Sequence, residues 1–448
     1  MNEPKKTTRF RMVTALVETF GLNPTVASGV AILIVLVGIL ALLWIVRSAP
    51  PRTLVLSSGP RGSSFQQYAD RYAKILARNG VTLEVLPSDG SLENLQRLTS
   101  PHPDADIGFV QGGLARSTDL SGVVSLGSVA HEPLWIFYRS PQRITRLSEL
   151  AGRRIAVGAM GSGTHTLALT LLKANEVTGS GATLLDLETE AAVAGLLEGK
   201  LDAIFLMGDS ASTRTVRTLV RSPNVQLYAF TQADAYVRRF GSLNRIELPQ
   251  GSIDLGRNLP AEDVVLVGPT VDLVARKGLH PALSDLLIEA AQEVHGRAGL
   301  LQRRGEFPAP LEHEFTVSDD AVRYYKSGKG LLNRIVGSFW IASFLNRILV
   351  VFVPAVLILI PGLRLLPIVY RWRIQLRIYR CYRLLLRLEW EVAETLTHAQ
   401  GEELLGRLDE IERDVNQLKV PAYFADQFYG LRGHIAFVRA RLQAVRTG

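Results

Sequence analysis

Residues 150–164, Leu-Ala-Gly-Arg-Arg-Ile-Ala-Val-Gly-Ala-Met-Gly-Ser-Gly-Thr, contain the local pattern that decides the fold. The apolar run Arg154–Val157 predicts a strand, and the glycine-rich residues after it predict a tight turn. A helix is expected from Thr164 to about Asn175. A strand, a glycine turn and a helix in this order are typical of an α/β unit.

The same order occurs near the start of the chain, where Thr53–Ser57 predicts a strand, 58–62 a turn, and Ser63 the start of a helix. Further strands and helices are expected at 81–86, 91–98, 106–110, 134–138, 203–207, 263–267 and 281–296. The alternation predicts two α/β lobes, each with a largely parallel sheet, and a cleft between them.

Two apolar segments bracket this region. The first, 27–46, carries no charge and is long enough to cross a membrane. A cleaved signal peptide is the alternative, but the run exceeds the usual length of such a segment. The second begins at Ile348 and contains Pro354, Pro361 and Pro367, so a kinked span or a re-entrant helix is also open.

Basic residues predict the orientation. They precede the first apolar segment at Lys5, Lys6, Arg9 and Arg11, and follow the second at Arg371, Arg373, Arg377, Arg380, Arg383 and Arg387. Flanking segments rich in Lys and Arg stay cytoplasmic. We therefore expect both termini in the cytoplasm and the lobes on the periplasmic side of a bacterial inner membrane.

The C-terminal region changes character. Residues 371–390 predict a basic amphipathic helix, and two apolar stripes separated by Pro421 predict a helical hairpin. A homodimeric coil through these helices is the alternative to simple packing. The expected plan is a cytoplasmic segment 1–26, an anchor 27–47, a bilobed solute-binding domain 52–335, a second span 346–370 and the helical region 371–448.

Composition excludes several functions. The net charge of +8 is explained by the arginine cluster beside the second span, which suits lipid headgroups better than nucleic acid. The sole cysteine, Cys381, forms no intrachain disulfide. The sequence has no Walker lysine, no HExxH motif and no cysteine cluster, so we expect no enzyme, no cofactor and no metal.

The glycine turns are the candidate binding site, because helix N-termini present unpaired N–H groups that suit a carboxylate or phosphate. One turn precedes the helix at Ser63, and the other precedes Thr164. Ser162 and His165 lie near each other, but no orienting acid is evident, so a ligand-lining or helix-end role is favoured for His165.

Several segments, in this order, resemble the TAXI group of TRAP-transporter solute receptors. They are Leu56–Ser64, Gly90–Leu95, Ala105–Gln111, Glu132–Trp135, Leu150–Thr164 and Gly199–Ala203. The segments Arg245–Pro249 and Asn258–Asp263 resemble a membrane-tethered branch of that group, as does the arginine-rich tail after Tyr370.

The resemblance implies a type II periplasmic-binding-protein fold that closes on a small, usually anionic solute. The family often has a tyrosine pair after its first turn, whereas Ser63-Ser64-Phe65 supplies at most one ring. This departure points to a different solute, or to a receptor that senses rather than delivers. The expected ligand-binding residues are Gly59, Gly62, Ser63, Ser64, Phe65, Gln111, Gly112, Ser162, Gly163, Thr164, His165, Asp209 and Ser210.

The sequence therefore predicts a membrane-tethered receptor that captures a small carboxylate-bearing solute for a separate integral-membrane permease of the TRAP type. The alternative is a sensor or scaffold that reports ligand occupancy through the cytoplasmic helices.

Overall fold

The computed structural model describes residues 13–14, 24–114, 118–177, 181–330, 335–392, 398–418 and 424–447. The basic residues before the first apolar segment and the predicted helix break at Pro421 lie outside this part of the chain. The chain divides into two compact units. One is Ser48–Asn346, and the other combines Met1–Arg47 with Arg347–Gly448.

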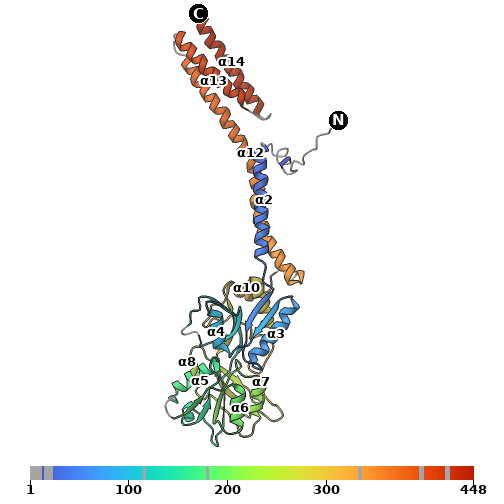
Figure 1. Ribbon diagram of the computed structural model, residues 1–448, viewed down its shortest axis with the longest axis vertical. Helices are drawn as coiled ribbons and strands as arrows, with labels where there is room; N and C mark the ends of the chain where they lie inside the picture. Colours follow the sequence, from blue (N-terminus) through green and yellow to red (C-terminus); the bar gives the residue numbers. More distant parts are fainter. Residues whose placement is uncertain are drawn as a thin grey trace. The chain divides into compact units, whose positions relative to one another are not determined.

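Lobe 1 of the Ser48–Asn346 unit is built on a five-stranded sheet with the order β2-β1-β3-β12-β4. Its strands are β1 (Thr53–Ser57), β2 (Thr82–Leu86), β3 (Ile107–Gln111), β4 (Val123–His131) and β12 (Thr270–Arg276). Its helices are α3 (Ser64–Arg78), α4 (Ser91–Thr99), α9 (Pro281–His295) and α10 (Asp319–Ser327). Helices α3, α4 and α10 of this lobe are labelled in Figure 1.

Lobe 2 contains a second five-stranded sheet with the order β7-β6-β8-β5-β9, and a separate hairpin of β10 and β11. Its strands are β5 (Trp135–Tyr138), β6 (Arg154–Ala156), β7 (Thr183–Leu185), β8 (Ala203–Leu206), β9 (Gln226–Leu227), β10 (Asn244–Leu248) and β11 (Val264–Gly268). Its helices are η2 (Leu147–Leu150), α5 (Gly163–Ala174), α6 (Thr189–Leu197), α7 (Thr213–Val220) and α8 (Ala233–Arg239).

The two sheets share one topology. In lobe 1, β2, β1 and β3 are parallel, and β12 pairs antiparallel with both β3 and β4. In lobe 2, β7, β6 and β8 are parallel, and β5 pairs antiparallel with both β8 and β9. This is the type II binding-protein arrangement, as predicted. The expectation of largely parallel sheets was wrong, because β5 and β12 are the strands that return from the opposite lobe and enter the sheet reversed.

The two connections between the lobes run side by side. One passes from β4 through Glu132 to β5, and the other passes from β11 through Pro269 to β12. Glu132 N donates to Pro269 O at 2.8 Å, and Leu134 N donates to Val267 O at 2.9 Å. Residues far apart in sequence therefore form one hydrogen-bonded hinge.

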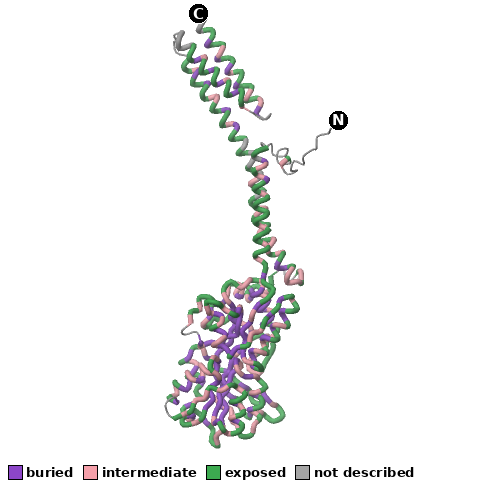
Figure 2. Tube along the Cα trace, viewed as in Figure 1, coloured by how far each residue is buried: buried purple, intermediate pink, exposed green. Residues whose placement is uncertain are grey.

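Each lobe has its own apolar core, seen as the buried segments in Figure 2. In lobe 1, one face of α3 packs with α9 against the sheet through Phe65, Tyr72 and Phe109. In lobe 2, the sheet packs against α5 and α8 on one side and against α6 and α7 on the other. Apolar burial of this extent is the main stabilising contribution to such a domain.

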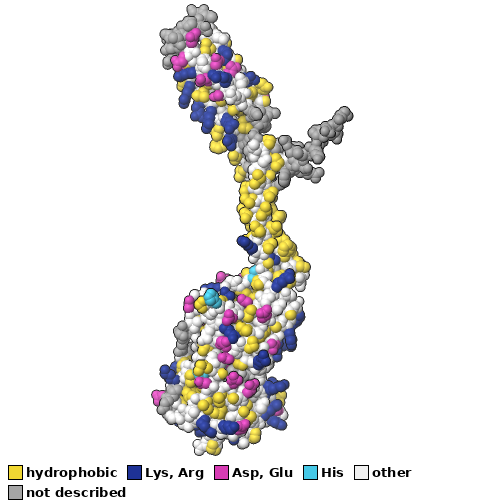
Figure 3. Space-filling model, in the orientation of Figure 1, with side chains coloured by type: hydrophobic (Ala, Val, Ile, Leu, Met, Phe, Trp, Pro, Cys, Tyr) yellow, Lys and Arg dark blue, Asp and Glu magenta, His cyan; other side chains and the backbone are white. Residues whose placement is uncertain are grey.

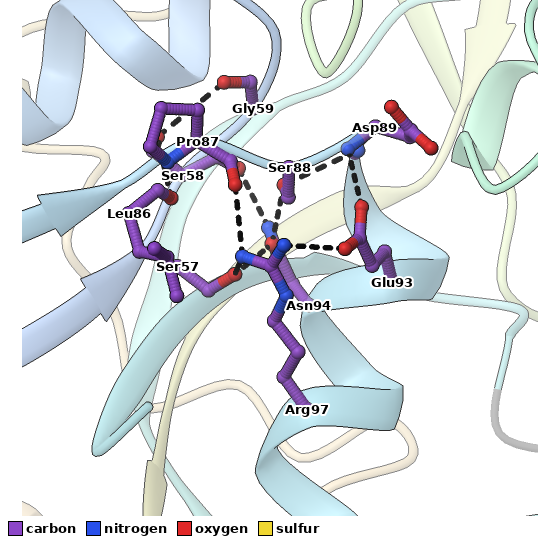
Figure 4. Close-up of polar contacts among 11 residues, drawn as sticks. Ser57, Ser58, Gly59, Leu86, Pro87, Ser88, Asp89, Glu93, Asn94 and Arg97 are labelled. Carbon is purple, nitrogen blue, oxygen red and sulfur yellow. Dashed lines mark hydrogen bonds and ion pairs between the residues drawn. The ribbon is translucent and has the colours of Figure 1, made fainter. Parts of the chain in front are cut away.

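A buried polar network fixes the ends of the lobe 1 strands that approach lobe 2 (Figure 4). Asn94 is fully buried, and its Nδ2 donates to Ser58 O at 2.7 Å and to Phe109 O at 2.9 Å. Its Oδ1 accepts from the hydroxyls of Ser57 at 2.6 Å and Ser88 at 2.7 Å. One side chain therefore holds the loops after β1 and β2 and the end of β3 in a fixed arrangement.

Asp272 of β12 is a buried acid whose protonation is linked to stability. It is 1% exposed and accepts from Ser128 Oγ at 2.5 Å. Burial raises its pKa to about 7 from an ordinary value of 3.8. Between these two values the folded state holds a proton that the unfolded state has lost. The contribution of Asp272 to the free energy of unfolding is therefore fully present at low pH and is lost as the pH rises towards 7.

We expect Asp272→Asn, which imitates the protonated acid, to raise the Tm at pH 8 by roughly 3–6 °C. The variant and the wild type should melt together near pH 4. Thermal unfolding of the full chain in detergent at both pH values measures the effect. An equal shift at both pH values would assign the change to packing rather than to protonation.

Among the described residues, two helices are long and apolar enough to cross a membrane. They are α2 (Pro24–Arg47), over Ala27–Arg47, and the first part of α12 (Phe339–Val392), over Phe339–Gly362. Figure 3 shows a largely hydrophobic surface over these helices. Near their ends, Arg347 Nη1 donates to Ile45 O at 2.7 Å. Helix α12 continues through Pro354, Pro361 and Pro367 without a break in its helical assignment.

The predicted hairpin is present as α13 (His398–Gln417) and α14 (Ala425–Thr447). It does not pack on itself alone. The end of α12 contributes Ile374, Ile378, Leu385 and Leu388 to the same core. The predicted basic amphipathic helix over 371–390 is therefore the first helix of a three-helix bundle, and its apolar stripe faces α13 and α14.

Candidate functional site

The first predicted turn lies at the boundary between the lobes, and its donors are already bonded to protein groups. Ser63 caps α3, with Gln66 N donating to Ser63 Oγ at 3.1 Å. Ser64 N donates across the boundary to the carbonyls of Gly208 and Ala211, both at 3.1 Å. The Phe65 ring does not line a ligand site. It lies on the buried face of α3, is fully buried and packs against Phe109.

The second predicted turn is occupied by a carboxylate of the chain itself. Asp209 Oδ2 accepts from Gly163 N at 2.6 Å and Thr164 N at 3.3 Å. Its Oδ1 accepts from Thr164 Oγ1 at 2.7 Å, and Ser210 Oγ lies 2.9 Å from the same hydroxyl. The N-terminus of α5 thus binds a carboxylate, as such a terminus should, but this carboxylate belongs to the loop after β8.

The glycines allow the lobes to touch at this boundary. A β-carbon at Gly163 would lie 2.2 Å from Gln111 Cδ, and one at Gly59 would lie 2.7 Å from Asp209 O. Gly90, with φ +134°, would place a β-carbon 2.8 Å from Asp209 Oδ2. These residues therefore permit close contact between the lobes.

The remaining predicted residues have other positions. Gly112 N donates to Thr270 O at 3.0 Å beside the hinge, and a β-carbon at Gly62 would point into open space. Ser162 Oγ donates to Ala159 O at 2.7 Å and caps α5, while the His165 ring lies 3.1 Å from Asp186. Ser162 and His165 therefore do not form a nucleophile–base pair.

Two buried acids lie at the hinge end of the boundary. Glu132, 3% exposed, accepts from Asp209 N at 2.7 Å. Burial, and next the nearby Asp209 carboxylate, raise the pKa of Glu132 well above its ordinary value. Burial also raises the pKa of Asp209, opposed by its hydrogen bonds from Thr164 and Gly163. Both groups therefore hold protons more tightly than exposed carboxyls do.

An open cavity lies on the other side of this contact, between α3, α7, the hinge and the segment after α9. It has a volume of about 420 Å³, which is in the range of small-molecule sites. Apolar lining comes from Trp135, Val216, Leu300 and Leu301. Of the residues predicted from sequence, only Ser64 lines it.

The charged lining of this cavity is mainly basic. Arg71 of α3, Arg217 of α7 and Arg297 after α9 reach it from separate elements. Among the described residues, none of the three arginines forms an ion pair with a carboxylate. The acid in the lining is Glu132, whose raised pKa reduces its negative charge. The cavity is therefore suited to an anion.

These arginines were not among the predicted residues, because the prediction considered only the glycine turns and the ends of the strands. Arg71 lies on the same face of α3 as Ser64 and Tyr68, at helical spacing, so following that face inward would have found it. Arg217 lies one turn after Thr213 on α7 in the same way. No local pattern indicates that Arg297 reaches the cavity.

Two further groups shape the cavity. His295, at the end of α9, is 3% exposed, and burial followed by the charge of Arg71 lowers its pKa to about 3. The Tyr68 ring lies edge-on to it, with ring centroids 4.6 Å apart. His295 is therefore neutral at physiological pH and adds no charge to the cavity.

Comparison with known proteins finds one sequence family. Residues 57–251 match the profile described as the NMT1-like family. This segment includes both glycine turns, Arg71, Arg217 and the first lobe connection, but not α9. No curated protein matches the chain.

Three of the solved structures similar to this chain are binding proteins by name. An ancestral arginine-binding protein bound to arginine has 16% identity, covering 55% of this chain and 92% of that one, with a TM-score of 0.35. A periplasmic binding protein from Brucella ovis with glutathione bound has 14% identity, 66% and 84% coverage and a TM-score of 0.37. The aliphatic sulphonate binding protein SsuA from Escherichia coli has 15% identity, 66% and 84% coverage and a TM-score of 0.35.

Proposed function

We propose that this protein is a membrane-tethered receptor that captures a small anionic solute, carrying a carboxylate or a related oxyanion, between its two lobes. The single observation that carries the proposal is the cavity of about 420 Å³ lined by Arg71, Arg217 and Arg297. Guanidinium groups pair with carboxylates through strong, charge-assisted hydrogen bonds. The apolar lining would accept the remainder of a small molecule.

The tethering proposal rests on the two apolar helices and on the basic residues that flank them. Helices α2 and α12 precede and follow the Ser48–Asn346 unit, so two spans would hold that unit on one side of the bilayer. The lysines and arginines next to the spans favour cytoplasmic ends and a periplasmic receptor. Two helices form no transport path, so the solute would pass to a separate integral-membrane permease of the TRAP type.

The arginines supply the test. We expect Arg217→Ala to weaken binding of the best ligand from a panel of small carboxylates, sulphonates and phosphates by about 10- to 100-fold, the loss of one charge-assisted contact. Binding to the full chain in nanodiscs is measured by calorimetry or thermal shift. The matched control is Arg214→Ala, an exposed arginine on the same helix that does not line the cavity.

Two results would contradict the proposal. One is a panel in which no anion binds the wild-type chain. The other is an equal loss of affinity in the Arg217 and Arg214 variants, since this would assign the effect to general charge around α7 rather than to the cavity.

The alternative function is a sensor of ligand occupancy. It is favoured by the direct contact between the lobes, in which Ser64 N donates to the carbonyls of Gly208 and Ala211, and by the three-helix bundle that follows the second apolar helix. A ligand could then act by favouring one lobe arrangement over another. Loss of solute uptake on deletion of the protein supports delivery. Unchanged uptake, with a cellular response lost on removal of residues 393–448, supports sensing.

A further inference from the structure

The outer face of α12 carries an exposed apolar stripe beyond the membrane-spanning segment. Its members are Trp372, Leu376, Tyr379, Leu386 and Trp390, exposed by 62%, 36%, 55%, 44% and 78%. The helix face that packs against α13 and α14 is different and contains Ile374, Ile378, Leu385 and Leu388. At 100° per residue, the centres of the two faces are separated by about 150° around the helix. The bundle therefore leaves this stripe uncovered.

The spacing of the stripe is that of a coiled-coil seam. From Trp372 the positions advance by four, three, four, three and four residues, with Arg383 as the one charged member. This is the alternation of d and a positions in a heptad repeat. The same alternation extends back to Val369 and Leu365, which are also exposed. A single polar residue at an a position is a known means of fixing register and oligomeric state.

A membrane surface does not account for the whole stripe. Because α12 is one uninterrupted helix, Trp390 lies about 27 Å further along its axis than Trp372. A lipid surface crossed by this helix would contact only the end next to the span. A second helix running alongside would cover its full length.

The charges beside the seam favour a parallel copy of the same chain. The e positions are Arg373, Arg380 and Arg387, and the g positions are Gln375, Tyr382 and Glu389. In a parallel pair each e residue meets a g residue of the other helix, so Arg380 would face Gln375, while Tyr382 and Glu389 keep their contacts with His434 inside the bundle. An antiparallel pair would place the e-position arginines against one another, whereas a parallel pair brings together only the two Arg383 side chains at one a position of the seam. Two copies inserted in one membrane in the same orientation also meet in parallel.

We propose that the protein forms a parallel homodimer through this α12 seam. The dimer would bring two receptor units to one site in the membrane and would leave the α13–α14 face of each bundle as it is. The proposal depends on the shared orientation of the copies and not on the identity of the solute.

Single cysteines test the seam in the full chain, reconstituted in membranes in a Cys381→Ser background. Disulfides form only when the two Cα atoms lie within about 7 Å. We expect copper phenanthroline to give strong dimer bands for Leu376→Cys and Tyr379→Cys. Arg377→Cys is the matched control, since this neighbouring residue is exposed but lies off the seam. Equal bands at 376 and 377 would indicate random collision and overturn the proposal, as would absence of a band at both seam positions.

A second variant separates dimerisation from folding. Leu376→Glu combined with Leu386→Glu should convert the dimer to a monomer in single-molecule photobleaching or native mass spectrometry. The helical content and melting of the bundle should stay unchanged, because both side chains are exposed. A wild-type chain that bleaches in single steps would contradict the dimer directly. Solute binding measured alongside reports separately on the receptor function.

Discussion

Gly268→Ala is expected to lower the stability of the Ser48–Asn346 unit by about 3 kcal/mol, at the upper end of what overpacking costs. A β-carbon at this position would lie 2.0 Å from Glu132 O and 2.8 Å from Pro133 Cα. Both contacts are backbone atoms of the other lobe connection, which is held by the hydrogen bonds between Glu132 and Pro269 and between Leu134 and Val267. Neither connection can move aside without breaking this ladder.

The measurement is denaturant unfolding of the full chain in detergent, followed by tryptophan fluorescence. Gly112→Ala is the matched control, because it lies beside the same hinge and its β-carbon would make an ordinary contact of 3.7 Å with Pro269. Gly268 also has an ordinary φ, so alanine adds no backbone strain there. Equal stability losses in the two variants would show that the close approach of the two lobe connections at Gly268 is not the cause of the destabilisation.

Asp209→Ala is expected to lower stability by about 2–4 kcal/mol. The substitution removes the acceptor of Gly163 N and Thr164 N and leaves these two backbone donors buried, whereas Thr164 Oγ1 keeps Ser210 Oγ at 2.9 Å. Each unsatisfied buried donor costs about 1–3 kcal/mol, and release of the buried carboxyl from its desolvation penalty offsets part of this loss. Asp209→Asn keeps an acceptor oxygen, so it should lose less stability.

The same variant tests whether the α5 terminus is a carboxylate site. In Asp209→Ala, the open N–H donors should bind acetate or formate, so either anion should raise the Tm of this variant more than that of the wild type. Chloride at equal ionic strength is the control for screening. A variant that is destabilised but gains nothing from acetate would show that the terminus requires a carboxylate attached to the chain.

The sequence alone predicted most of the secondary structure and the bilobed plan. The strand–turn–helix elements at 53–78 and 154–174 are local, because an apolar run, glycines at a turn and an N-cap serine each act within a few residues. The two apolar helices and the C-terminal hairpin followed from periodicity in the same way. The antiparallel position of β5 and β12 did not, because strand pairing is decided between distant segments.

For the candidate site, the sequence predicted that the N-terminus of α5 binds the carboxylate of a solute, and in the structure the Asp209 carboxyl group of the chain itself accepts the hydrogen bonds there. Only the tertiary structure decided which carboxylate lies there, since Asp209 is brought to Gly163 by the packing of β8 beside β6. The tertiary structure also decided which residues line the cavity. Arg71, Arg217 and Arg297 meet because three elements far apart in the chain converge at one hinge. Local chemistry specifies what a segment can form and bind, whereas the folded arrangement of distant segments decides which groups are near enough to bind it.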